Sequence, residues 1–142
     1  MAYDLIVIGT GPGGYVCAIR AAQLGLSTAV VEKEKLGGVC VNIGCIPTKA
    51  LLHSAYVANL VAHDAKELGV EPGSVKLDYG VAMQRSRKVS EQNSKGVGFL
   101  MKKHKVTVIK GSGVLGRNRT VKVGKDEYQA KKAVVIATGS RV

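Results

Sequence analysis

The feature that most constrains this chain is a glycine-rich segment between two short apolar runs near the N-terminus. Residues 3–9 read Tyr-Asp-Leu-Ile-Val-Ile-Gly, and residues 9–14 read Gly-Thr-Gly-Pro-Gly-Gly, which fits the pattern G-x-G-x-x-G. The apolar run predicts a buried parallel strand, and the glycines predict a tight turn into a helix whose free N–H groups can face a pyrophosphate. The segment therefore favours an α/β fold that binds a dinucleotide.

The residues after the glycines complete this pattern. Helical spacing over Tyr15–Leu24 predicts a helix that ends at Gly25, and Thr28–Glu32 predicts a second buried strand. Its last residue, Glu32, lies about twenty positions past the glycines, where an acid can accept hydrogen bonds from a ribose. A glycine pattern alone would be weak evidence, but strand, turn, helix, strand and acid in this order indicate a nucleotide site.

A second motif follows in residues 38–47, where Cys40 and Cys45 are spaced C-x-x-x-x-C. A disulfide needs Cα atoms roughly 4.4 to 6.8 Å apart, whereas five extended steps span roughly 16 Å. The chain must therefore bend back, and Asn42 and Gly44 tolerate such a bend. Pro47 suits the first turn of a helix, so we expect Cys45 at a helix N-terminus, where a thiolate is favoured. The pair is interpreted as a redox disulfide beside a flavin.

Two other interpretations of the cysteine pair remain. A structural disulfide is disfavoured because no secretory signal precedes it. A zinc site usually needs four ligands in closely spaced pairs, and the other candidates are Cys17 and three scattered histidines.

The run Leu36–Leu52, set behind the glycine fingerprint, closely resembles the pyridine nucleotide disulfide oxidoreductases. The resemblance extends from Met1 to Ser140. Within this family, the segment Ile46-Pro-Thr-Lys-Ala-Leu-Leu52 is most similar to the dihydrolipoamide dehydrogenases, although glutathione and mercuric reductases share the two cysteines and the surrounding glycines. The resemblance implies an α/β, Rossmann-like FAD-binding domain over residues 1–142, with a parallel sheet, a helical pair after the redox disulfide and a small antiparallel β-meander.

The resemblance also implies roles for individual residues. Cys40, the more accessible thiol in the family, would exchange with a dithiol substrate, and Cys45 would lie against the flavin. Lys49 would lie near flavin N5, where its charge would favour the reduced flavin and the neighbouring thiolate. The positions implied to contact FAD are Gly9, Gly11, Pro12, Gly13, Gly14, Glu32, Lys33, Gly38, Val39, Cys40, Lys49, Gly113, Ala137, Thr138 and Gly139, and no metal is implied.

The implied enzyme oxidises a dihydrolipoyl dithiol through Cys40, Cys45 and FAD, with NAD⁺ as acceptor. Its partners would be dihydrolipoamide or a dihydrolipoyl domain and the other subunits of a 2-oxo acid dehydrogenase complex, and the full-length protein would be a homodimer. At 142 residues the chain is much shorter than the family's subunit. We therefore expect an N-terminal piece without the NAD and interface domains, which would not turn over alone. The alternative is a non-catalytic fragment that binds adenine nucleotide or a partner.

The rest of the chain is expected to complete the domain. Apolar spacing predicts one long helix over Pro47–Leu68, a linker over residues 71–74 and a second helix over about Tyr79–Lys105. The antiparallel meander is expected from three short segments, Val106–Ile109, Thr120–Val123 and Glu127–Gln129. A final buried strand, Ala133–Ala137, is expected to return to the parallel sheet.

Charge is distributed unevenly, because the whole formal charge of +11 arises from residue 49 onward. The basic residues lack interleaved aromatics, so we expect a solvated surface and no nucleic-acid partner. The alternative to a solvated surface is that Arg85, Arg87 and Lys88 attract the acidic lipoyl or partner subunits of a dehydrogenase complex. No run of eighteen apolar residues predicts a membrane span. The first strand begins within three residues of Met1, which predicts a bacterial-type cytoplasmic protein without a signal peptide, or a mature form that is already processed.

Overall fold

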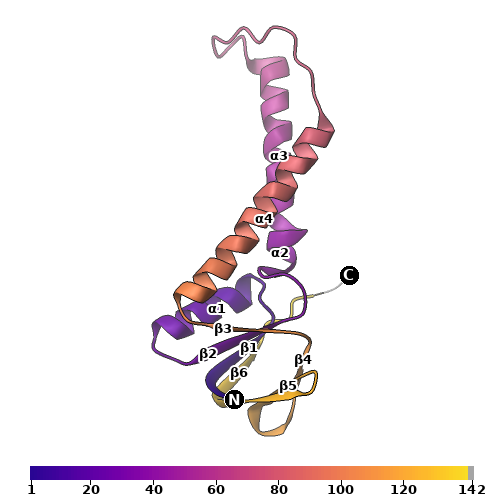
Figure 1. Ribbon diagram of the computed structural model, residues 1–142. Coiled ribbons are helices and arrows are strands. Elements are labelled where there is room, and N and C mark those ends of the chain that lie inside the picture. Colours follow the sequence, from indigo (N-terminus) through magenta and orange to yellow (C-terminus); the bar gives the residue numbers. More distant parts are fainter. Residues whose placement is uncertain (141–142) are drawn as a thin grey trace.

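The computed structural model describes residues 1–140, which form one six-stranded sheet, helices packed on it and a long helical hairpin that extends away from it (Figure 1). The strands are β1 (Ala2–Ile8), β2 (Thr28–Glu32), β3 (Thr107–Lys110), β4 (Gly113–Leu115), β5 (Thr120–Val123) and β6 (Asp126–Ile136). The helices are α1 (Pro12–Gln23), α2 (Gly38–Asn42), α3 (Cys45–Asn59) and α4 (Tyr79–Lys103). A π-helical turn, Leu60–Asp64, continues α3, and a short 3-10 turn, Arg117–Arg119, precedes β5.

The sheet has the strand order β3-β2-β1-β6-β5-β4. Strand β1 pairs in parallel with β2 and β6, and β2 pairs in parallel with β3. Strands β4, β5 and the beginning of β6 pair antiparallel. Strand β6 belongs to both parts, because Asp126–Gln129 pairs with β5 and its later residues pair with β1. The parallel sheet and the antiparallel meander expected from the sequence are therefore both present. The expected return strand is the end of β6, but residues 133–137 are half-buried or exposed and not buried as expected.

The expected place of Val106–Ile109 in the meander is wrong. Strand β3 pairs in parallel with β2, and Ala29 faces Thr107 while Glu32 faces Lys110. The physical reason is that α4 brings the chain back to the end of the sheet where β2 begins, so the next strand must run in the same direction as β2. The apolar pattern of a short strand does not encode this direction.

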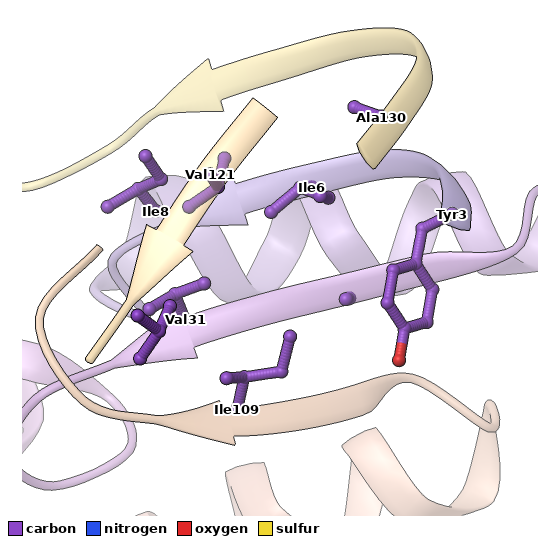
Figure 2. Close-up of a cluster of buried hydrophobic side chains, with 9 residues drawn as sticks. Tyr3, Ile6, Ile8, Val31, Ile109, Val121 and Ala130 are labelled. Carbon is purple, nitrogen blue, oxygen red and sulfur yellow. The ribbon is translucent and has the colours of Figure 1, made fainter. Parts of the chain in front are cut away.

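The parallel strands carry apolar side chains on both faces, and each face has its own core. On one face, Leu5 and Val7 of β1 pack against α1 and the end of α4, which contributes Val97 and Met101. On the other face, the buried side chains come from β1, β2, β3, β5 and β6 (Figure 2); they are Tyr3, Ile6, Ile8, Ala29, Val31, Ile109, Val121, Val123 and Ala130. Burial on two sides explains why β1 and β2 read as continuous apolar runs.

Helices α3 and α4 lie side by side in the hairpin (Figure 1). The first predicted helix is confirmed, although it begins at Cys45 and ends in the π-helical turn at Asp64, before the expected end at Leu68. The second is confirmed over Tyr79–Lys103 and passes through its glycines without interruption. Asp78 caps its N-terminus by accepting a hydrogen bond of 3.1 Å from the Val81 amide. Of the helices within residues 1–140, none is both long and apolar enough to span a membrane.

Candidate functional site

The carboxyl ends of four parallel strands, β1, β2, β3 and β6, meet at one edge of the sheet. The amide of Gly9, just after β1, donates to the Val31 carbonyl of β2 at 2.8 Å, and the amide of Ala137, just after β6, donates to the Ile8 carbonyl at 2.8 Å. The Gly111 amide, after β3, donates to the Glu32 carbonyl at 2.9 Å. Loops that leave a parallel sheet at this edge form the usual crevice for ligands of open α/β folds.

The glycines of the fingerprint have different structural requirements. A Cβ atom on Gly9, whose φ is +97°, would overlap the carbonyl oxygen of Ala137, and one on Gly14 would overlap the carbonyl oxygen of Gly9. Gly9 therefore requires glycine for the close approach of its turn to the end of β6, and Gly14 requires glycine for the close packing of α1 on that turn. Gly11 and Gly13 have open space where a Cβ would lie, with no atom within 4 Å. The space beside the start of α1 is therefore accessible, as a bound pyrophosphate would require.

The turn before α2 packs directly on the fingerprint loop. A Cβ atom on Gly38 would lie 2.8 Å from the Cα of Gly11, and the Gly37 amide donates to the Thr10 carbonyl at 3.0 Å. Gly38 has a φ of +60°, so a side chain there would be both strained and crowded. This contact brings Gly38 and the exposed Val39 to the same loop that holds Gly11.

The carboxylate of Glu32 is held by three protein hydrogen bonds. Its Oε2 accepts from the Thr10 amide at 3.0 Å and from Thr10 Oγ1 at 2.5 Å, and its Oε1 accepts from the Glu34 amide at 2.9 Å. The neighbouring Lys33 is exposed, and its Nζ lies 3.6 Å from Glu34 Oε1. Thr10 was not among the site residues expected from the sequence, although its place between the first two glycines was a usable signal.

The later glycine-bearing segments reach the same edge of the sheet. A Cβ atom on Gly113 would lie 3.1 Å from Ile8 Cγ2 and 3.2 Å from Val31 Cγ1, so Gly113 lies over the ends of β1 and β2. Ala137 lies against Gly9, and Thr138 and Gly139 follow it as exposed residues.

The two cysteines form a disulfide with a Cα–Cα distance of 4.6 Å. Cys40 lies in the short helix α2, and Cys45 is the first residue of α3, as the sequence predicted. Gly44 allows the required bend, because a Cβ there would lie 3.1 Å from the Val39 carbonyl oxygen. Asn42 Nδ2 donates to the carbonyls of Leu36 and Gly38 at 3.0 and 2.9 Å. Asn42 thus holds the turn that precedes the first cysteine.

The accessibility of the cysteines differs from the expectation, because Cys45 is exposed and Cys40 is half-buried. Cys40 lies in a helix that packs against α4, whereas Cys45 lies at the open first turn of α3. Lys49 is also exposed and lies about one turn further along α3, on the same side as Cys45. No group of three or more His, Cys, Asp or Glu side chains gathers as a metal site among residues 1–140.

Comparison with known proteins agrees with this geometry. The family model described as "Pyridine nucleotide-disulphide oxidoreductase" matches residues 3–142. A dihydrolipoyl dehydrogenase of Mycobacterium leprae is 53% identical over 146 residues, which cover 98% of this chain and 31% of the relative. A dihydrolipoyl dehydrogenase of Rhizobium etli is 48% identical over 160 residues, which cover 99% of this chain and 33% of the relative.

Among solved structures, the flavoprotein disulfide reductase RclA from Escherichia coli, described as HOCl-induced and solved as a Cu(II) complex, superposes with a TM-score of 0.79 at 27% identity. The match covers 98% of this chain and 29% of that structure. The chain thus spans about 30% of the length of the relatives that it matches. The glycine-rich loop, the neighbouring disulfide and these matches together show that the chain belongs to the pyridine nucleotide-disulphide oxidoreductase family.

Proposed function

We propose that this chain is the FAD-binding, redox-disulfide part of a flavoprotein that oxidises a dihydrolipoyl dithiol, with NAD⁺ as the final acceptor. The observation that carries the proposal is the contact between Gly38 and Gly11. It joins the helix that contains Cys40 to the loop that opens the nucleotide crevice, so a disulfide and a dinucleotide would be neighbours. Relatives at 53% identity that are named dihydrolipoyl dehydrogenases support the choice of substrate.

The residues at the crevice fit FAD. The start of α1 carries Pro12 in its first turn, no acidic residue there and open space beside Gly11, which suits a pyrophosphate. Glu32 would receive the adenosine ribose, and the backbone of Gly113 would meet the adenine. When bound, FAD would supply a two-electron carrier between the protein thiols and the nicotinamide.

The chemistry of this chain's own residues is thiol–disulfide exchange. A substrate thiolate would attack the Cys40 sulfur, form a mixed disulfide and release Cys45 as a thiolate. The second substrate thiolate would then attack the substrate sulfur of the mixed disulfide, which closes the substrate disulfide and releases Cys40. The substrate loses two electrons and the protein disulfide gains them, while the protons of the substrate thiols pass to the solvent or to the released thiolates.

The position of Cys45 would favour its role as the leaving thiolate. Unpaired N–H groups at the start of α3 and the nearby positive charge of Lys49 both stabilise a negative charge there. A flavin ring placed on Cys45 would also cover the more exposed sulfur. Cys40 would then be the sulfur that a substrate can reach.

The test is an anaerobic dithionite titration of the longest natural form of the protein, followed by visible absorbance. We expect a flavin spectrum and, after two electrons, a long-wavelength band that is present in wild type and in Cys17→Ser but absent in Cys45→Ser. Cys17 is a suitable control because it is the free cysteine of the described chain and lies on α1. A protein without flavin, or a band that persists in Cys45→Ser, would contradict the proposal.

Substrate and partners are tested separately. Oxidation of dihydrolipoamide with NAD⁺, compared with reduction of glutathione disulfide with NADPH, distinguishes the proposed enzyme from the other reductases of the family. We propose a cytoplasmic homodimer that works with dihydrolipoyl domains of a 2-oxo acid dehydrogenase complex. Docking to this complex should be compared across a salt series between wild type and a variant in which only the charges of Arg87 and Lys88 are reversed. Arg85 is left unchanged because it donates a hydrogen bond within the hairpin.

A further inference from the structure

Thr10 connects three chain segments at the carboxyl edge of the parallel strands. Its side chain is fully buried, and its hydroxyl donates to Glu32 Oε2 at 2.5 Å, across 22 positions of sequence. Its amide donates to the same oxygen at 3.0 Å, and its carbonyl accepts from Gly37 at 3.0 Å. Thr10 therefore joins the fingerprint loop, the end of β2 and the turn before α2.

These hydrogen bonds fix the orientation of the Glu32 carboxylate. A free glutamate side chain has three rotatable bonds, and fixing them on ligand binding opposes the binding. Here Oε2 accepts two hydrogen bonds and Oε1 accepts one, from the Glu34 amide. A carboxylate has about four acceptor positions, so capacity for a ligand hydroxyl remains on a group that is already oriented.

We propose that Thr10 is a positioning residue for ribose recognition, whose hydroxyl holds the Glu32 carboxylate ready to accept hydrogen bonds from the ribose hydroxyls of an adenine nucleotide. This inference rests on the proposed function in that the natural ligand is the adenosine half of FAD. A merely structural hydroxyl would stabilise the fold and affect every ligand equally. A positioning hydroxyl affects only ligands that donate to Glu32.

The experiment measures the dissociation constants of ADP and of 2′,3′-dideoxy-ADP by calorimetry, with the flavin-free, longest natural form of the protein. Thr10→Val keeps the shape of the side chain and removes the hydroxyl. We expect it to weaken ADP binding about fivefold to tenfold, as for loss of a hydrogen bond to a charged group, and dideoxy-ADP binding by less than about twofold. Thr10→Ser, which keeps the hydroxyl, should restore ADP binding to within about twofold of wild type.

Thr28→Val is the matched control. Thr28 is also buried and lies at the other end of β2, where its hydroxyl donates to the Leu26 carbonyl at 3.0 Å. This variant should leave both affinities within about twofold of wild type, because the hydrogen bond that it removes is not connected to Glu32. If Thr10→Val does not fold, Thr10→Ala removes the hydroxyl without placing a methyl group against the carboxylate and should give the same ratio of affinities.

The outcomes separate this inference from the proposed function. If Thr10→Val weakens the binding of ADP and of dideoxy-ADP equally, or weakens neither, the positioning role is overturned. FAD binding by wild type would still support the flavoprotein in that case. Binding of ADP without FAD, with the expected Thr10 dependence, would support the positioning role and contradict the flavoprotein. If wild type binds neither ADP nor FAD, both the positioning role and the proposed function are overturned.

Discussion

Arg85 Nη1 on α4 donates a hydrogen bond of 3.0 Å to the carbonyl oxygen of Ala50, in the helix that begins at Cys45. The same carbonyl accepts from Ser54 Oγ at 3.2 Å. Further along α4, Ser94 Oγ donates to the Leu36 carbonyl at 2.8 Å, just before the turn that leads to Cys40. Helix α4 therefore holds the redox segment at both ends, and its side chains determine how the disulfide lies relative to the sheet.

Removing the Arg85 contact should loosen this hold. We expect Arg85→Met to lower the free energy of unfolding by about 1 to 2 kcal/mol, because the Ala50 carbonyl loses a charge-assisted donor. Urea denaturation followed by circular dichroism measures the change. Arg87→Met removes an exposed arginine from the same helix and should change the stability by less than about 0.5 kcal/mol. Equal effects of the two substitutions would show that the Ala50 contact contributes nothing measurable.

Two buried serines on α4 allow a matched comparison. Ser90 Oγ has no hydrogen-bond partner among the described residues, whereas Ser86 Oγ donates to the Met83 carbonyl at 2.8 Å. Each change to alanine should raise the free energy of unfolding by about 0.5 kcal/mol, because alanine has the higher helix propensity. Ser90→Ala should therefore stabilise the protein by about 0.5 to 1.5 kcal/mol, because it also removes a buried unpaired hydroxyl, and Ser86→Ala should be about neutral. Thermal unfolding of both variants checks this order, and a less stable Ser90→Ala would reveal an unrecognised partner.

The close packing of α1 on the sheet predicts intolerance at Gly14. A Cβ there would overlap the Gly9 carbonyl oxygen, which belongs to the backbone and cannot rotate away. Gly14→Ala should therefore lower the free energy of unfolding by about 2 to 3 kcal/mol. Gly96 lies in the middle of α4 with no atom within 4 Å of the Cβ position, so Gly96→Ala should raise stability by about 0.5 to 1 kcal/mol. Denaturation midpoints compare the two, and a stable Gly14→Ala would disprove the overlap.

The sequence predicted local features of the site better than long-range pairings. The bend between Cys40 and Cys45 and the start of a helix at Cys45 follow from spacing and from Pro47, because both depend on residues close in sequence. The parallel pairing of β3 could not be predicted, since it depends on how far α4 carries the chain. The half-burial of Cys40 depends likewise on the packing of α2 against α4, which no local pattern encodes.

The contacts that orient the site were not predictable for the same reason. Thr10 meets Glu32 only because β1 and β2 are neighbours in register, and Arg85 meets Ala50 only because the hairpin closes. The place of Thr10 between two glycines points to the loop but does not show which carboxylate it meets, and an arginine on an amphipathic helix has no feature that distinguishes it from a surface residue. The chemistry of the site can thus be predicted from its motifs, whereas the residues that position it require the fold.

The ion pair between Glu91 and Lys95 makes a pH-dependent prediction. Lys95 Nζ lies 2.7 Å from Glu91 Oε1, one turn apart on the exposed face of α4, and the hydrogen bond and charge of Lys95 lower the pKa of Glu91. A lowered carboxyl pKa contributes stability that is present above the unfolded-state value and is lost as the pH falls through the folded-state value. Lys95→Met should therefore raise the pKa of Glu91 toward its ordinary value, and its destabilising effect should be present at neutral pH and absent in strong acid.

Carbon-detected NMR titration of the Glu91 carboxyl in wild type and in Lys95→Met measures this shift directly. Lys102→Met removes a lysine about three turns further along the same helix and should leave the pKa of Glu91 unchanged. The shift between wild type and Lys95→Met should also shrink at about 1 M salt, because both partners are exposed and solvent ions screen them. A Glu91 pKa that responds equally to both substitutions would mean that the overall charge of α4, and not the pair, lowers it.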